Sequence, residues 1–141
     1  MQCKVKWTGL PGMSFMAETG SGHAVVMDGA PDGGGNNLAP RPMEMVLLGT
    51  GGCTAYDVVV ILRRSGQDVT GCEVSLEATR ADTDPKVFTA INFHFQVSGK
   101  GLKSNLVERA IKLSHDKYCS ASIMIAKTAT LTHTWEIVET A

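Results

Sequence analysis

The stretch that decides the fold runs from Pro42 to Leu62 and reads PMEMVLLGTGGCTAYDVVVIL. A proline is tolerated at the first position of a helix, and a carboxylate such as Glu44 is favourable in the first turn. These signals predict a long helix that begins at Pro42, continues to about Arg64 and ends at Ser65-Gly66. The helix is apolar on nearly every side, which is typical of a helix at the centre of a fold.

The apolar part of this helix, residues 45–62, is also about as long as a minimal membrane span. Three glycines, two threonines and Asp57 interrupt it, and none of these residues is favourable on a single helix in lipid. We therefore interpret the segment as a buried core helix and expect no membrane partner.

Short segments on both sides of the helix alternate between apolar and polar residues, as strands do. Strands are predicted over residues 2–7, 14–17, 23–27, 72–78, 87–97 and 130–138, and further helices from Ser104 and over 121–126. A glycine- and proline-rich loop, residues 29–41, precedes the long helix. The order β-β-β-α-β-β-α-α-β, with strands in runs, predicts an α+β fold of antiparallel sheets in a single domain, residues 1–141.

The composition suits a folded globular protein, with 43% hydrophobic and 19% charged residues. The net charge of −1 argues against a nucleic acid or an anionic membrane as partner, because either would favour a basic surface. With 6% aromatic residues, a surface for stacking bases is also unexpected.

The four cysteines form no CxxC pair and no Cys/His cluster with the spacing of a zinc site. The first residues lack the apolar region of a signal peptide, so we expect a cytoplasmic protein with reduced thiols. Cys3 and Cys72 fall on apolar strand faces, where a packing role is expected. No metal or other cofactor is predicted.

Cys53 lies in the middle of the long helix, directly after Gly51-Gly52. Two glycines inside a helix cost about 1 kcal/mol each relative to alanine, so the close approach of another backbone or of a substrate is expected there. The alternative is that Cys53 is a small core residue, since free cysteine is often buried. Asp57, one turn later, would raise the pKa of a neighbouring thiol, so we expect its carboxylate to be hydrogen-bonded or at a subunit contact.

Cys119 precedes a short apolar helix, with Ser120 as the expected cap. A sulfur at the amino end of a helix lies near unpaired N–H groups, and this position predicts a lowered pKa for the Cys119 thiol. Such a thiol is a competent redox partner. The alternative is a packing role between Tyr118 and the apolar helix.

The motifs Pro42-Met43-Glu44-Met45, Gly51-Gly52-Cys53 and Tyr118-Cys119-Ser120 resemble those of the OsmC/Ohr family, the osmotically inducible and organic hydroperoxide resistance proteins. Their combination is closest to the YhfA-like branch of that family, and the resemblance extends over essentially the whole chain. It implies an OsmC-like fold, in which antiparallel sheets wrap around a long central helix. It also implies an intertwined homodimer with active sites at the subunit interface.

The resemblance further implies a thiol-dependent peroxidase. Cys53, as the peroxidatic residue, would attack the O–O bond of an organic hydroperoxide or H₂O₂ and become a sulfenic acid. Cys119, as the resolving residue, would condense with it to a disulfide, which an external dithiol would reduce.

Ohr-type members orient the reactive thiolate with an arginine from the early strands, which a glutamate holds. This chain has no arginine before Arg41, and its carboxylate at Glu44 lies one residue after the aligned position, Met43. Arg41 and Glu44 are therefore candidates for supporting roles. The missing early arginine favours an alternative function, a small-ligand-binding or redox-sensing protein with little or no turnover. A metal site at Cys53 and Cys119 is a third alternative, without histidines at suitable spacing.

Overall fold

The computed structural model describes all 141 residues, and the chain divides into two compact units, Met1–Leu48 and Gly49–Ala141. In the first unit, β1 (Cys3–Trp7), β2 (Phe15–Thr19) and β3 (Ala24–Met27) form an antiparallel sheet in that order. A short 3₁₀ helix, η1 (Pro31–Gly33), follows, and the long helix α1 (Pro42–Arg64) begins in this unit.

The predicted loop between β3 and α1 is organised by one buried carboxylate, that of Asp28. It accepts hydrogen bonds from the backbone N–H groups of Gly29, Asn36 and Leu38 at 2.8, 3.1 and 3.0 Å. A loop without an apolar pattern thus satisfies its backbone donors through a side chain.

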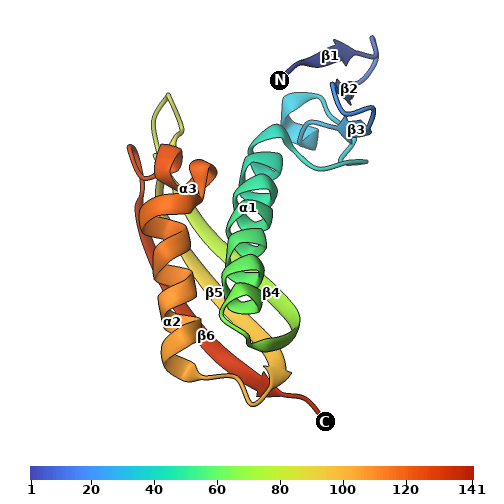
Figure 1. Ribbon diagram of the computed structural model, residues 1–141. Coiled ribbons are helices and arrows are strands. Elements are labelled where there is room, and N and C mark those ends of the chain that lie inside the picture. The colour runs from blue at the N-terminus through green and yellow to red at the C-terminus, as the bar shows by residue number, and fades with distance from the viewer. The chain divides into compact units, whose positions relative to one another are not determined.

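The second unit contains a sheet of β4 (Asp68–Arg80), β5 (Phe88–Lys100) and β6 (Thr130–Glu139) in that order (Figure 1). Strands β4 and β5 form the predicted antiparallel hairpin. Strands β5 and β6 run parallel, so the antiparallel prediction is wrong for this pair. The chain between them passes through α2 (Ser104–Leu113), the π-helical segment η2 (Ser114–Tyr118) and α3 (Ser120–Ile125), which is the long crossover that a parallel pair requires.

One face of this sheet forms the core of the second unit. Alternate residues of β5, namely Ile91, Phe93, Phe95 and Val97, are at most 1% exposed. Full burial of side chains of this size contributes about 1.5–3 kcal/mol each. Helices α1 and α2 lie over this face of the sheet (Figure 1).

Helix α1 buries one side only. Thr54, Val58 and Leu62, spaced four residues apart, are fully buried, whereas Leu48 and Tyr56 are 59% and 71% exposed. The sequence predicts a buried core helix that is apolar on nearly every side. Within a single chain, 28% of its most apolar 18-residue stretch is buried. By length and composition alone, α1 is long and apolar enough to cross a membrane. The core helix of a soluble protein can have the same length and composition.

Candidate thiol site

Folding brings Cys53 of α1 and Cys119, at the junction of η2 and α3, to one place in the second unit. Both sulfur atoms and a carboxylate oxygen of Asp57 lie within 4.8 Å of one another. Both cysteines are free thiols, with Cys53 half-buried and Cys119 fully buried. The two sulfurs of a disulfide are about 2.05 Å apart. A local movement of the two cysteine side chains must therefore close the remaining gap before a disulfide can form.

Cys119 itself caps α3, where Ser120 was the expected cap. Its sulfur accepts a hydrogen bond from the Ser122 N–H at 3.4 Å, and the Ser122 hydroxyl donates to the Cys119 carbonyl at 3.2 Å. The predicted direction of the Cys119 pKa is wrong. Burial raises the pKa of this thiol, the hydrogen bonds from Ser122 oppose that rise, and the adjacent Cys53 thiol adds to it. Complete desolvation therefore outweighs the favourable helix terminus.

Asp57 is held by a buried chain of hydroxyl groups. The Ser114 hydroxyl donates to the Asp57 carboxylate at 3.2 Å, and the Thr54 and Ser114 hydroxyl oxygens lie 2.9 Å apart. Both hydroxyl-bearing residues are fully buried. Of the two expectations for the Asp57 carboxylate, a hydrogen bond or a subunit contact, the hydrogen bond is confirmed.

The π-helical segment connects this chain of hydroxyls to the second thiol. The Cys119 N–H donates to the Ser114 carbonyl at 2.8 Å, which closes one wide turn between the two residues. Such turns are rare and are found often at functional sites. Sequence reasoning did not assign Ser114 or Thr54 to the site. A sequence feature could have indicated them, because each is a hydroxyl residue among the apolar residues of a helix.

A cavity of about 280 Å³ opens beside the cluster. Its lining is mostly apolar, with Asp57 and Arg64 as the charged members, and consists of Asp57, Val60, Ile61, Arg64, Ser65, Leu113 and Tyr118. Asp57 belongs both to this lining and to the thiol cluster. Its carboxylate therefore links the two thiols to the cavity.

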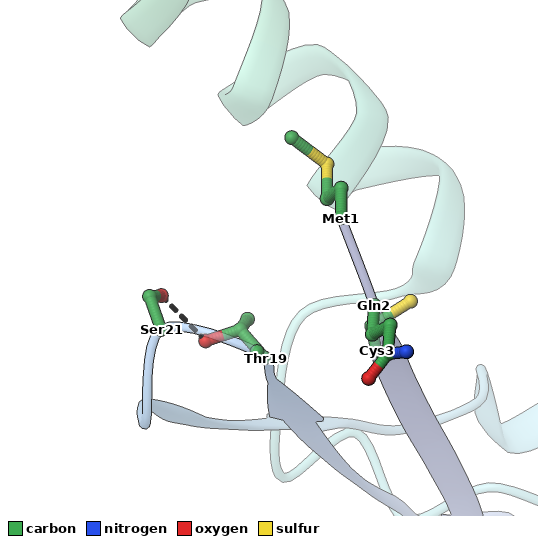
Figure 2. A pocket seen from close by; sticks show the side chains of 6 residues that line it. Met1, Gln2, Cys3, Thr19 and Ser21 are labelled. Atoms are coloured by element: carbon green, nitrogen blue, oxygen red, sulfur yellow. Dashed lines mark hydrogen bonds between the residues drawn. The ribbon is translucent and has the colours of Figure 1, made fainter.

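A larger hollow of about 560 Å³ lies in the first unit, beside the start of β1 and the end of β2 (Figure 2). Its lining includes Cys3, and the Thr19 and Ser21 hydroxyl oxygens lie 2.9 Å apart at its edge. Cys3 is exposed, so its predicted packing role is wrong within a single chain. The lining contains no second thiol and no carboxylate or imidazole, which makes it a poor candidate for redox chemistry.

The decisive comparison concerns the family. A family model described as OsmC-like protein matches residues 33–134. The chain belongs to the OsmC family. The Escherichia coli protein YhfA is 47% identical over 138 residues, which cover 98% of each chain. Membership in the OsmC family confirms the predicted α+β fold with two sheets and a long central helix.

Solved structures agree with this assignment. One, described as a structural genomics target, is 46% identical with a TM-score of 0.87, over 99% of this chain and 100% of its own. An organic hydroperoxide resistance protein OsmC from Legionella pneumophila is 18% identical and shares the fold, with a TM-score of 0.68 over 96% and 95% of the two chains. OsmC-family members are generally dimeric, and membership supports a soluble protein with a role in redox chemistry or peroxide stress.

The two candidate supporting residues lie at the start of α1. Glu44 accepts a hydrogen bond from the Arg41 backbone N–H at 2.9 Å, which is the reciprocal contact of a capping box. Glu44 therefore has a structural role at the first turn of this OsmC-family helix. Both residues belong to the first unit, whereas the thiol cluster belongs to the second. Their supporting role in catalysis stays a prediction.

Proposed function

We propose that the protein is a thiol-dependent peroxidase that reduces organic hydroperoxides or H₂O₂ in the cytoplasm. The observation that carries this proposal is the separation of at most 4.8 Å between the free thiols of Cys53 and Cys119. The two thiols are far apart in the sequence, and Asp57 beside them lines a cavity. The fold is that of a family with organic hydroperoxide resistance proteins among its members.

The reaction follows from the exposure of the two thiols. Cys53, the more accessible one, attacks the O–O bond as a thiolate, which releases an alcohol or water and leaves a sulfenic acid. Cys119 then displaces the hydroxyl group of the sulfenic acid and forms the disulfide. An external dithiol reduces that disulfide and restores both thiols.

The test is the consumption of cumene hydroperoxide or H₂O₂ in the presence of dithiothreitol or dihydrolipoamide. We expect Cys53→Ser to abolish turnover and Cys72→Ser, at the half-buried cysteine of β4, to retain it. Equal rates for wild type and Cys53→Ser would contradict the proposal.

The exposed apolar surfaces support a homodimer in which each chain is a single OsmC-like domain. Leu48 and Tyr56 on α1 are exposed, and so are Val5, Trp7 and Val26 of the first sheet. Large apolar surfaces without cover are typical of subunit interfaces. A second copy of the chain would cover them.

A second candidate function is binding of a small ligand or redox sensing with little turnover. Asp57 favours it, because a carboxylate rather than a cation lies beside the two sulfurs, and a negative charge opposes formation of a thiolate. This function predicts retention of a ligand in the cavity with negligible hydroperoxide consumption by the wild-type protein.

A further inference from the structure

The Asp57 carboxylate lies close to both thiols of the pair. One of its oxygens is within 4.8 Å of both sulfurs, and it lines the adjoining cavity. A charged side chain in the middle of an apolar helix is costly unless it is paired or has a function. The Ser114 hydroxyl satisfies one oxygen of the carboxylate at 3.2 Å.

The second thiol needs a proton acceptor. Cys119 is fully buried, and its raised pKa, caused mainly by that burial, keeps the sulfur in the protonated form at neutral pH. A thiol attacks a sulfenic acid or a mixed disulfide only as a thiolate. Its proton must therefore leave as the S–S bond forms, in a place where water does not reach the sulfur directly.

We propose that Asp57 accepts the proton of the Cys119 thiol as the Cys53–Cys119 disulfide forms, and that Ser114 holds Asp57 in position for this transfer. The inference rests on the proposed thiol chemistry of the pair. In the peroxidase cycle, the Cys119 sulfur bonds to the Cys53 sulfur and the S–O bond of the sulfenic acid breaks. The Cys119 proton passes to the Asp57 carboxylate and then to the departing hydroxide, so that one water is released.

Ser114 acts as a positioning residue, because it contacts the carboxylate and not the sulfurs. Its hydroxyl is held by Thr54 at 2.9 Å, and its carbonyl accepts the Cys119 N–H at 2.8 Å. The same residue thus fixes both the proton acceptor and the backbone of the thiol that gives up the proton. The cavity beside Asp57 gives the proton an exit to solvent.

The test isolates the resolving step without any peroxide. Reduced protein lacking the other two cysteines, Cys3→Ser/Cys72→Ser, receives one equivalent of methyl methanethiosulfonate. This reagent converts the Cys53 thiol into a small methyl disulfide. Attack by Cys119 then releases methanethiolate and closes the intramolecular disulfide. Acid quenching and intact-protein mass spectrometry follow both steps with time.

In this background we expect Asp57→Asn to form the methyl disulfide at least as fast as the parent protein does. The ring closure should slow by about 10²-fold, the lower end of the usual contribution of a general base. Ser114→Ala should slow ring closure as well, whereas Ser114→Thr, which keeps the hydroxyl, should restore it. The control Asp116→Asn changes an exposed carboxylate of the same segment, paired with Lys112, and should behave as the parent does.

Ring closure in Asp57→Asn within about threefold of the parent rate, with native circular dichroism, would overturn the inference. The outcome is separable from that of the proposed function. If wild type consumes no hydroperoxide and Asp57→Asn still slows ring closure, the peroxidase proposal fails and Asp57 remains the proton acceptor.

Discussion

At the scale of the residue, folding brings together side chains of the thiol site that are far apart in the sequence. Cys53, Thr54 and Asp57 come from one helix, and Ser114 and Cys119 from another segment. The sequence predicted the two cysteines through their motifs and predicted a hydrogen bond for Asp57. It did not predict the pKa of Cys119, because local position indicates a helix terminus but not how completely the sulfur is buried.

The half-buried residue His115 carries a prediction at this scale. Its ring stacks on His133 at 5.2 Å between centroids and lies edge-on to Phe93 at 4.8 Å, and both ring nitrogens lack hydrogen-bond partners. Burial, with a contribution from His133, lowers the pKa of His115 to about 4. The sequence gives no sign of this histidine pair, because the two residues meet only through the crossover between β5 and β6.

The lowered pKa makes stability depend on pH in a defined window. The unfolded state, with a histidine pKa of about 6.5, binds more protons than the folded state between about pH 6.5 and 4. The free energy of unfolding is therefore highest above pH 6.5 and falls as the pH falls to 4. Since His115 is partly accessible to solvent, we expect a loss of about 2 kcal/mol, less than the full shift implies.

Urea denaturation at neutral pH and near pH 4.5 checks this expectation. His115→Phe should remove most of the loss between the two conditions, and His23→Asn, at an exposed histidine, should leave it unchanged. An identical pH dependence in His115→Phe and wild type would contradict the account of this residue.

At the scale of the element, α1 shows what local signals determine. Its start at Pro42 and its end before Gly66 are as predicted, because a first-turn proline, an early carboxylate and a glycine stop are all local. Gly66 has a φ of 72° and Gln67 N–H bonds to the Leu62 carbonyl, which is the expected helix stop. The parallel pairing of β5 with β6 was not predicted, because it depends on where a long crossover returns the chain.

The paired glycines before Cys53 are not equivalent. A Cβ at Gly51 would lie 2.7 Å from the Leu76 Cδ1 atom of the sheet, whereas a Cβ at Gly52 would meet nothing within 4 Å. Alanine gains about 1 kcal/mol in helix propensity at either position. At Gly51 the end of the Leu76 side chain must move to make room for the Cβ, which offsets this gain in whole or in part.

We therefore expect Gly51→Ala to be less stable than Gly52→Ala by about 1 kcal/mol in the free energy of unfolding. Chemical denaturation of the two variants side by side gives the difference. Both variants also carry Tyr56→Glu, so that no second copy covers α1 in this comparison. A Gly52→Ala variant that is the less stable of the two would then contradict the expected order.

At the scale of the whole molecule, the exposed apolar side of α1 predicts association with a second copy. A charge placed on this side would be buried in the interface without a partner, which is strongly unfavourable. We expect Tyr56→Glu to convert a particle of twice the chain mass into one of the chain mass. Glu108→Lys, on the exposed side of α2, should leave the mass unchanged.

Light scattering coupled to size exclusion measures this mass at micromolar concentration. A wild-type protein with the mass of one chain would contradict the proposed homodimer. The sequence indicated the association through its resemblance to the OsmC/Ohr family and through an unusually apolar helix. The structure of a single chain shows which side of that helix remains uncovered.

The central claim is that Cys53 and Cys119 form a redox pair, and peptide mapping tests it most directly. Reduced protein is treated with one equivalent of hydroperoxide, alkylated and digested, and the disulfide-linked peptides are identified by mass spectrometry. The account predicts a single disulfide between Cys53 and Cys119, with Cys3 and Cys72 recovered as alkylated thiols. Recovery of Cys53 and Cys119 as free thiols, or a disulfide that joins either of them to another cysteine, would contradict it.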